Sequence, residues 1–249
     1  QPLTLAQMLQ QTADLNVPVF QICDYPAIES WSDAQLCALK QQADALGITL
    51  ELGTRGLATA HLQRYLQMAA LLEAKIIRSM CFTASHRPTP AEAQQLIADV
   101  LPAFERQQVK LCLETYEQIS SAELMALIDR FPSPWLAVCL DPANCVAGLE
   151  LPQQVIANTA ARVGNLHIKD FAFSRRDGWV GFTLAGVPLG EGLLDYDALI
   201  ASVRPAEKGI NQIIEHWLPW QESAERTCQM EAQWTQRCVE FLRRKQDQE

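Results

Sequence analysis

The sequence lacks several features that would place it in common protein classes. No apolar run approaches the roughly 18 residues that a transmembrane helix needs, and the first residues show no signal-peptide pattern. No CxxC pair occurs among the eight cysteines, which argues against a disulfide framework or a zinc knuckle. We therefore expect a cytoplasmic protein with reduced, buried thiols at Cys81, Cys112 and Cys139.

Positive charge is also scarce. The chain has 20 Lys and Arg residues against 29 Asp and Glu residues, which gives a net charge of −9. Nucleic acid and anionic membranes both require a basic surface, so neither is an expected partner. With 249 residues, 49% of them apolar, the chain can bury one large core, and we expect a single domain over residues 1–249.

Strand and helix patterns alternate along the chain. The predicted strands are 17–25, 48–55, 75–82, 110–117, 135–142, 163–171 and 211–217. The predicted helices are 4–15, 32–47, 59–74, 89–108, 120–131, 151–162, 195–203 and 221–243. Alternation at steps of roughly 30 residues predicts parallel strands with right-handed crossovers. Because the first element is a helix, we expect an α/β fold, a (β/α)8 TIM barrel whose first strand lies upstream of Gln1.

Four predicted strands end in a polar side chain that interrupts an apolar pattern. Side chains alternate between the two faces of a strand, so LCLET, VCLDP, NLHIKD and QIIEHW each turn one polar residue into the barrel. These residues are Glu114, Asp141, His167 and Glu215. Taken singly, each would more often be an ion-pairing, capping or hydrogen-bonded residue. Taken together at the carboxyl ends of barrel strands, they predict a site for a divalent metal (Mn, Mg, Co or Zn), because a cation removes the repulsion among three carboxylates.

Other polar residues share the inward face of their strands. Gln21, Glu51 and Arg78 are candidates for substrate binding. Arg78 could hold a substrate carboxylate or phosphate, or it could pair with Glu51 inside the barrel.

The strand that carries His167 continues into two further charged residues. Lys169 shares the inward face, where it could contact the substrate or form an ion pair with a metal-binding carboxylate. Asp170 faces outward, and we expect it to cap the turn. The segment 172–192 that follows is predicted to be a long loop that covers the barrel mouth as a lid or wall.

The motifs CLET (112–115), CLDPAN (139–144), HIKD (167–170), PLGEG (188–192) and IIEH (213–216) resemble the xylose isomerase-like TIM barrel superfamily. Within it, the chain is similar to the sugar phosphate isomerase/epimerase group, over residues 17–220. The resemblance implies that Glu114, Asp141, His167 and Glu215 bind one divalent metal, and that Glu114 and Glu215 are also the catalytic acid/base pair. A ketose would chelate the metal while one carboxylate removes a proton next to the carbonyl and the other returns one.

Two positions depart from the ketose 3-epimerases of that group. Asn144 stands where they have histidine, and we expect it to contact the substrate. Lys169 stands near the place of an arginine and is typical of inosose-dehydratase-like members, in which a cation beside the metal can hold an enolate or protonate a leaving hydroxyl. We therefore add Lys169 to the catalytic candidates.

The main hypothesis is a metal-dependent isomerase or epimerase of a small keto-sugar, sugar acid or cyclitol, acting through a metal-bound enediolate. The alternative is a lyase, a dehydratase or decarboxylase, that uses the same site on an oxo-sugar acid or an inosose. An abasic-site endonuclease is disfavoured, because the chain has only four histidines. A non-catalytic barrel is disfavoured, because the set of metal-ligating side chains is complete. We expect a small carbohydrate substrate and leave homo-oligomer formation open.

Overall fold

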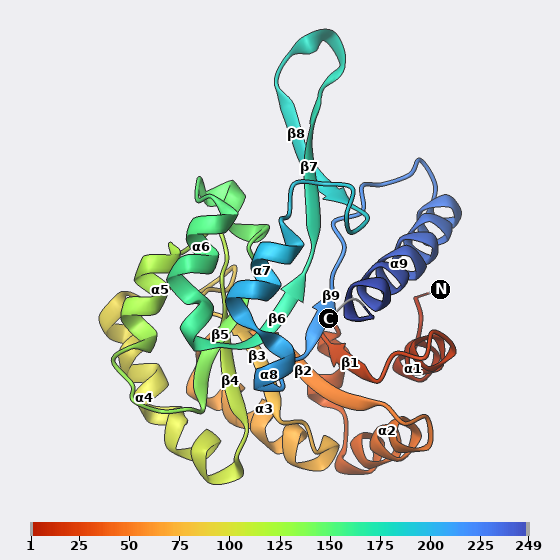
Figure 1. Cartoon of the computed structure of the whole chain (residues 1–249). Helices are drawn as coiled ribbons and strands as arrows, with labels where there is room; N and C mark the ends of the chain where they lie inside the picture. The colour runs from red at the N-terminus through yellow and green to blue at the C-terminus, as the bar shows by residue number, and fades with distance from the viewer. Residues whose placement is uncertain (1, 248–249) are drawn as a thin grey trace.

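The computed structural model describes residues 2–247, and seven parallel strands among them form a nearly closed barrel (Figure 1). In their order around the barrel, the strands are β1 (Val19–Ile22), β2 (Thr49–Arg55), β3 (Ile76–Met80), β4 (Lys110–Glu114), β5 (Leu136–Leu140), β6 (Val163–Ile168) and β9 (Gln212–Ile214). Strand β9 pairs with β6 and approaches β1 on its other side. The predicted TIM-barrel fold is confirmed.

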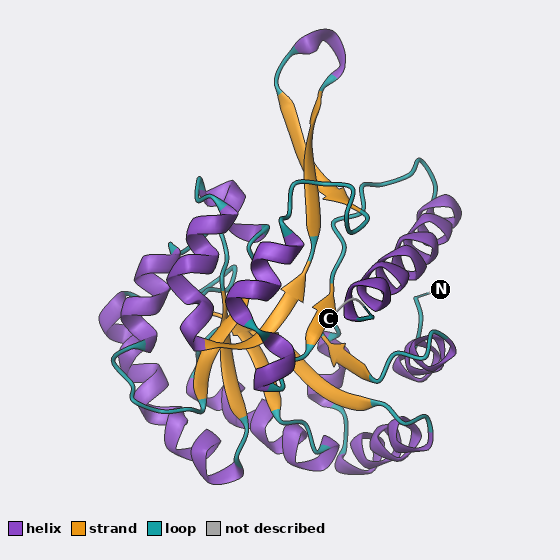
Figure 2. Cartoon of the chain, viewed as in Figure 1, coloured by secondary structure: helices purple, strands orange, loops and turns teal. Residues whose placement is uncertain are grey.

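Helices surround this barrel (Figure 2). They are α1 (Leu5–Asp14), α2 (Asp33–Ala45), α3 (Thr59–Leu72), α4 (Pro90–Gln107), α5 (Ser121–Ile128), α6 (Pro152–Thr159), α7 (Tyr196–Val203), α8 (Pro205–Lys208) and α9 (Ala224–Gln246). The eight predicted helices correspond to α1–α7 and α9, and the four-residue α8 was not predicted. No helix described over residues 2–247 combines the length and apolar character needed to cross a bilayer.

Local sequence signals explain where several helices begin. Helices α1, α2, α4 and α5 each start with a capping box, in which a Ser or Thr hydroxyl and the side chain three residues later satisfy each other's backbone N–H groups. The pairs are Thr4 with Gln7, Ser32 with Gln35, Thr89 with Glu92 and Ser120 with Glu123. These caps fix the helix starts and so set the length of the loops that precede them.

The two faces of the barrel strands pack into two different clusters. Side chains on the outer face, such as Leu113, Leu140 and Ile168, are fully buried against the helices. On the inner face, Cys112 and Cys139 pack with Ala137 in a small separate cluster. All eight cysteines are free, as expected for reduced thiols. The apolar side chains on the inner face of β4 and β5 are thus small ones.

The predicted long loop 172–192 is wrong, because this segment is mostly a β-hairpin. Strands β7 (Asp170–Arg175) and β8 (Phe182–Val187) pair in antiparallel register and project beyond the barrel mouth (Figure 1). Residues 176–181 form the turn, in which Gly178 and Gly181 adopt positive φ angles. The alternation of DFAFSR and FTLAGV about a glycine-containing turn is a hairpin pattern. The predicted strand 163–171 correspondingly divides at Lys169 into β6 and β7.

Candidate metal centre and active site

Four polar side chains meet at the carboxyl ends of the barrel strands. Glu114 is the last residue of β4, Asp141 follows β5, His167 lies in β6 and Glu215 follows β9. One ligand atom from each lies within 4.8 Å of the others. Glu114, Asp141 and His167 are buried, whereas the Glu215 side chain is 35% exposed. The cluster is therefore accessible from the side of Glu215.

His167 faces two of these carboxylates. Its Nδ1 lies 3.2 Å from Glu114 Oε1 and 3.0 Å from Glu215 Oε2. Burial alone lowers the pKa of His167, but Cys139 and the two carboxylates raise it well above its usual value. Nδ1 of His167 thus lies between two carboxylate groups that both favour a proton or a cation at this point.

Asp141 is held by the backbone around it. The Thr115 hydroxyl accepts the Asp141 N–H at 2.8 Å and donates to the Asp141 carbonyl at 2.9 Å, which joins the ends of β4 and β5. Asp141 Oδ1 accepts the backbone N–H groups of Ala143 and Asn144 at 3.0 and 3.3 Å. Burial raises the pKa of Asp141 to about 6, against the effect of Lys169. The carboxyl group is thus fixed in position by its surroundings.

Lys169 forms ion pairs with candidate metal-binding carboxylates, which was one of the two roles expected for it. Its Nζ lies 2.8 Å from Asp141 Oδ2 and 3.1 Å from Glu215 Oε1, and it donates to Asn144 Oδ1 at 2.9 Å. The ammonium group also lies 4.2 Å from the centre of the Trp217 ring. Burial lowers the pKa of Lys169, but Asp141 and Glu215 favour the ammonium form and raise the pKa above its usual value. For Glu215 burial raises the pKa, but bonds from His167 and Lys169 outweigh it and lower the pKa to about 2.

Arg78 pairs with Glu114, so the pair with Glu51, one of the two alternatives expected for this side chain, is not formed. Its Nη2 lies 2.7 Å from Glu114 Oε2, and its Nη1 donates to the Thr54 carbonyl at 3.2 Å. Arg78 lies opposite Gly53 on β2 and Cys112 on β4, so Glu51 lies two residues before its level and Glu114 two residues after it. The guanidinium extends toward the carboxyl ends of the strands and therefore meets Glu114. Asn144 also contacts Glu114, with Nδ2 at 3.4 Å from Oε1.

The residues present fit a divalent cation. Glu114 Oε2 and Asp141 Oδ2 are buried and, despite their ion pairs with Arg78 and Lys169, receive no hydrogen bond of good geometry. Buried carboxylate oxygens in this condition are unusual, and a cation would satisfy them. Three carboxylates and one imidazole suit Mg²⁺, Mn²⁺, Co²⁺ or Zn²⁺. Binding of a metal by these residues stays a prediction, as does its identity.

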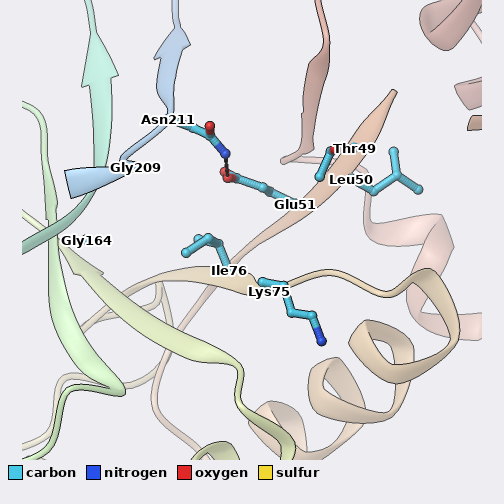
Figure 3. A pocket seen from close by; sticks show the side chains of 8 residues that line it. All are labelled: Thr49, Leu50, Glu51, Lys75, Ile76, Gly164, Gly209 and Asn211. Atoms are coloured by element: carbon cyan, nitrogen blue, oxygen red, sulfur yellow. Dashed lines mark hydrogen bonds between the residues drawn. The ribbon is translucent and has the colours of Figure 1, made fainter. Parts of the chain in front are cut away.

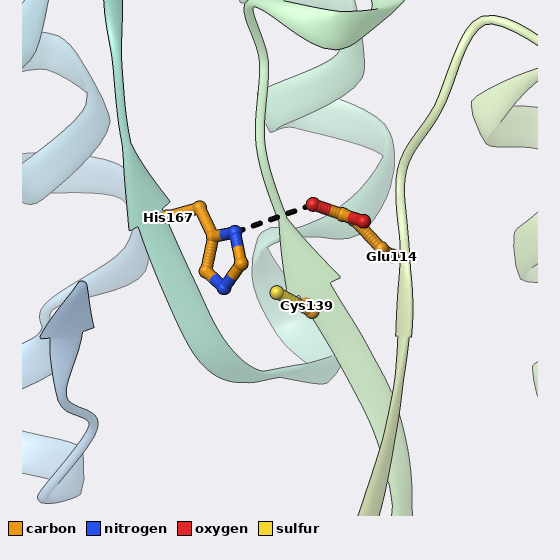
Figure 4. A group of neighbouring side chains, drawn as sticks. All are labelled: Glu114, Cys139 and His167. Atoms are coloured by element: carbon orange, nitrogen blue, oxygen red, sulfur yellow. Dashed lines mark ion pairs between the residues drawn. The ribbon is translucent and has the colours of Figure 1, made fainter. Parts of the chain in front are cut away.

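A thiol lies immediately beside this group. Glu114, Cys139 and His167 form a second set whose ligand atoms lie within 4.8 Å of one another (Figure 4). Burial raises the pKa of the Cys139 thiol. Cys139 therefore adds a soft sulfur donor next to a set of hard oxygen donors.

Gln21 and Glu51 lie deeper in the barrel than the metal candidates. Gln21 Oε1 lies 2.8 Å from His167 Nε2, and Gln21 Nε2 donates to Glu51 Oε2 at 2.9 Å. Asn165 and Asn211 complete this network, and neither was predicted from the sequence. Asn165 shares the inward face of β6 with His167, so strand alternation could have identified it. Substrate contact by Gln21 or Glu51 stays a prediction, and their observed contacts are with protein groups.

Asp170 does more than cap a turn. Its Oδ1 accepts the N–H groups of Phe171 and Leu194 at 2.8 and 2.9 Å, and its Oδ2 accepts those of Gly190 and Gly192 at 3.0 and 2.9 Å. A Cβ at Gly192 would lie 2.2 Å from Asp170 Oδ1, which explains a glycine there. The PLGEG segment is thereby tied to the strand that carries the candidate site.

The tip of the hairpin is exposed. Trp179 is 77% exposed, and the Arg175 guanidinium lies over the rings of Trp179 and Phe182 at 4.6 and 4.7 Å from their centres. At the base of the hairpin, the Gly186 N–H donates to the Trp217 carbonyl at 3.0 Å. A role as a lid over the site stays a prediction.

Comparisons with known proteins agree with this fold. The sequence model of the xylose isomerase-like TIM barrel family matches residues 9–244. The 3-oxo-isoapionate decarboxylase of Pectobacterium atrosepticum is 58% identical over 241 residues, spanning 97% of this chain and 88% of that protein.

Two solved structures show the same architecture at low identity. D-psicose 3-epimerase of Clostridium cellulolyticum, solved with D-tagatose, is 14% identical with a TM-score of 0.77, covering 97% of this chain and 93% of that one. A xylose isomerase-like TIM barrel protein of Mycobacterium smegmatis, in complex with magnesium, is 16% identical with a TM-score of 0.72, covering 94% and 87%. Such identities support the fold and not a shared substrate.

These comparisons correct the main functional hypothesis. An isomerase or epimerase was expected, but the relative that shares 58% of its residues with nearly the whole chain is a decarboxylase, which is a lyase. The likeness to an epimerase rests on the barrel alone. Asn144 and Lys169 are the two positions at which the sequence departs from the ketose 3-epimerases.

Proposed function

Because the chain belongs to the xylose isomerase-like TIM barrel family, we propose that it is a metal-dependent decarboxylase of an oxo-sugar acid, with 3-oxo-isoapionate as the first substrate to test. The observation that carries this proposal is the 58% identity to a 3-oxo-isoapionate decarboxylase over 97% of the chain. The cluster of Glu114, Asp141, His167 and Glu215 supplies a site suited to that chemistry.

The chemistry of a 3-oxo acid defines what the site must do. The bond between the carboxylate carbon and C2 breaks, and carbon dioxide leaves. The electron pair moves toward the carbonyl at C3, which gives an enolate, and a proton then adds to C2 to restore the ketone. No oxidant or reductant is needed, but one proton is consumed. A divalent cation held by the four residues would act as a Lewis acid toward the charge that develops on the carbonyl oxygen.

In this scheme Lys169 would stabilise that charge and deliver the proton. Its ammonium group is 1% exposed and lies between Asp141 and Glu215, so it stays charged in a site of low dielectric. Nζ would donate a proton to C2. Water that enters beside Glu215, which contacts Nζ and is partly exposed, would return a proton to the lysine.

Glu114 and Arg78 have a supporting part in this scheme. Arg78 is buried and pairs with Glu114 Oε2, so it would orient that carboxylate, while its Nε has no hydrogen-bond partner among the described residues. A carboxylate that must leave as carbon dioxide gains nothing from a strong cationic partner, because such a partner stabilises the charged ground state more than the transition state.

Product analysis in deuterated water tests the proposal. The purified chain, supplied with Mg²⁺ or Mn²⁺ and 3-oxo-isoapionate, is expected to release one carbon dioxide for each substrate consumed. NMR should show one deuteron on the carbon that carried the carboxylate, and EDTA should stop the reaction. Conversion of the substrate into an isomer without release of carbon dioxide would contradict the proposal.

A further inference from the structure

The second nitrogen of the His167 ring has a partner that determines where the ring carries its proton. His167 Nε2 lies 2.8 Å from Gln21 Oε1. An amide oxygen only accepts hydrogen bonds, so Nε2 must carry a hydrogen and donate it. In the neutral ring, the lone pair is then on Nδ1, which faces Glu114 and Glu215 where the cation would lie.

The direction of the Gln21 amide is itself fixed. Gln21 Nε2 donates to Glu51 Oε2 at 2.9 Å and to Asn165 Oδ1 at 3.0 Å. A reversed amide would place its oxygen against both of these oxygens. An ionised carboxylate only accepts hydrogen bonds, so Glu51 excludes the reversed orientation. Glu51 therefore acts on His167 through Gln21.

Glu51 is an unusual residue for a barrel interior. It is 1% exposed, and among residues 2–247 no Lys or Arg forms an ion pair with it. Its other hydrogen bonds come from neutral amides. Asn165 Nδ2 lies 3.0 Å from Oε2, and Asn211 Nδ2 lies 2.6 Å from Oε1, the second bond being drawn in Figure 3. A buried carboxylate without a cationic partner costs stability, so its presence calls for another explanation.

We propose that Glu51 and Gln21 are positioning residues that hold His167 with the proton on Nε2 and keep Nδ1 ready for the metal. The inference rests on the metal site of the proposed function, but not on the reaction that occurs there. Loss of such outer partners of a metal-binding histidine typically weakens metal affinity about 10- to 100-fold.

Titration of EDTA-treated protein with Co²⁺, followed by visible absorption, tests this inference without reference to turnover. Gln21→Met keeps the length of the side chain but removes the acceptor for Nε2–H. Its Co²⁺ affinity is expected to fall about 10- to 100-fold, with a changed absorption spectrum.

Asn211→Ala is the matched control. It also removes a hydrogen bond to Glu51, but it leaves every contact of Gln21 in place. The freed Glu51 Oε1 would face a cavity of about 150 Å³ lined by Thr49, Lys75 and Gly209, in which water can replace the amide. Co²⁺ affinity is therefore expected to stay close to that of the native protein.

An exchange of the two side chains supplies the rescue. Gln21→Glu alone sets two carboxylates against each other, so it should weaken the network. With Glu51→Gln added, the carboxylate at position 21 accepts Nε2–H and the amide at position 51 donates to it. The double variant is expected to recover most of the Co²⁺ affinity that Gln21→Met loses.

Equal Co²⁺ affinity in Gln21→Met and the native protein, or equal loss in Asn211→Ala, would overturn the inference. Should Gln21→Met not fold, nitrogen-15 NMR of the native protein with Zn²⁺ decides, since a proton on Nδ1 of His167 contradicts the inference and one on Nε2 supports it. Differential Co²⁺ binding without release of carbon dioxide would refute the decarboxylase and leave this inference standing.

Discussion

Two polar layers lie one above the other inside the barrel, and they are organised differently. The upper layer, at the carboxyl ends of the strands, holds Glu114, Asp141, His167, Lys169 and Glu215 in a network of ion pairs, and two of its carboxylate oxygens lack a good hydrogen bond. The lower layer has a single carboxylate surrounded by three amide side chains that satisfy both of its oxygens.

The difference indicates that the two layers have different roles, one as a support and the other as a candidate ligand site. A layer that is already fully hydrogen-bonded needs no further ligand and can act as a rigid support. A layer with unsatisfied oxygens offers ligands that a cation would complete. His167 connects the two, because Nδ1 faces the upper layer and Nε2 the lower one.

The largest effect is expected from Lys169→Met in the upper layer. Turnover of 3-oxo-isoapionate should fall roughly 100- to 10,000-fold, because the proposed proton donor is lost. Removing the ammonium group also removes the positive partner of Asp141 and Glu215. The affinity of these carboxylates for a metal ion should therefore rise or stay unchanged. Steady-state kinetics and Co²⁺ titration of the same preparation check both statements, and turnover near the native rate would remove Lys169 from the mechanism.

Asp170→Asn tests the backbone contacts that Asp170 makes beside the upper layer. An amide offers one acceptor oxygen, so two of the four backbone N–H groups bound by Asp170 lose their partner. The free energy of unfolding is expected to fall by about 1–3 kcal/mol, measured by urea denaturation. Asp129→Asn, at an exposed ion pair with Arg162, is the control and should cost less than about 1 kcal/mol.

Cys139 lies at the boundary between the layers, so soft and hard cations should distinguish its role. Cd²⁺ is expected to bind the native protein with sulfur-to-metal absorption in the ultraviolet, because Cys139 adds a thiol to Glu114 and His167. The absorption should persist in Cys112→Ser and disappear in Cys139→Ser. The same absorption in both variants would show that the thiolate ligand is a different cysteine.

The smallest effect is expected outside both layers, at the hairpin tip. Trp179 is exposed and packs only with neighbours in its own hairpin, among the contacts observed. Trp179→Ala should therefore change the free energy of unfolding by no more than about 0.5 kcal/mol, measured by the same urea denaturation. A larger loss would mean that the tip packs against another surface.

Much of the upper layer could be predicted from the sequence, because it follows from strand alternation. Glu114, Asp141, His167 and Glu215 each interrupt an apolar pattern at a strand end, and parallel strands bring such ends together. The barrel fold was predictable for the same reason, since strands and helices alternate along the chain.

Contacts that depend on register or on side-chain length could not be predicted in this way. Arg78 lies between the levels of Glu51 on β2 and Glu114 on β4, and its side chain extends toward Glu114, a direction that the pattern of one strand does not contain. Glu51 and Gln21 were predicted to face inward, but the sequence pattern did not predict how deep in the barrel they lie relative to His167. The predicted reaction was wrong, because the same kind of cation site supports both isomerisation and decarboxylation.

Anomalous diffraction from crystals grown with Mn²⁺ tests the central claim most directly, namely that the upper layer is a cation site oriented from below. We predict a single strong peak among Glu114, Asp141, His167 and Glu215, within roughly 2.0–2.4 Å of His167 Nδ1, with Nε2 still bonded to Gln21. A peak elsewhere, or a His167 ring turned so that Nε2 meets the metal, would contradict the account.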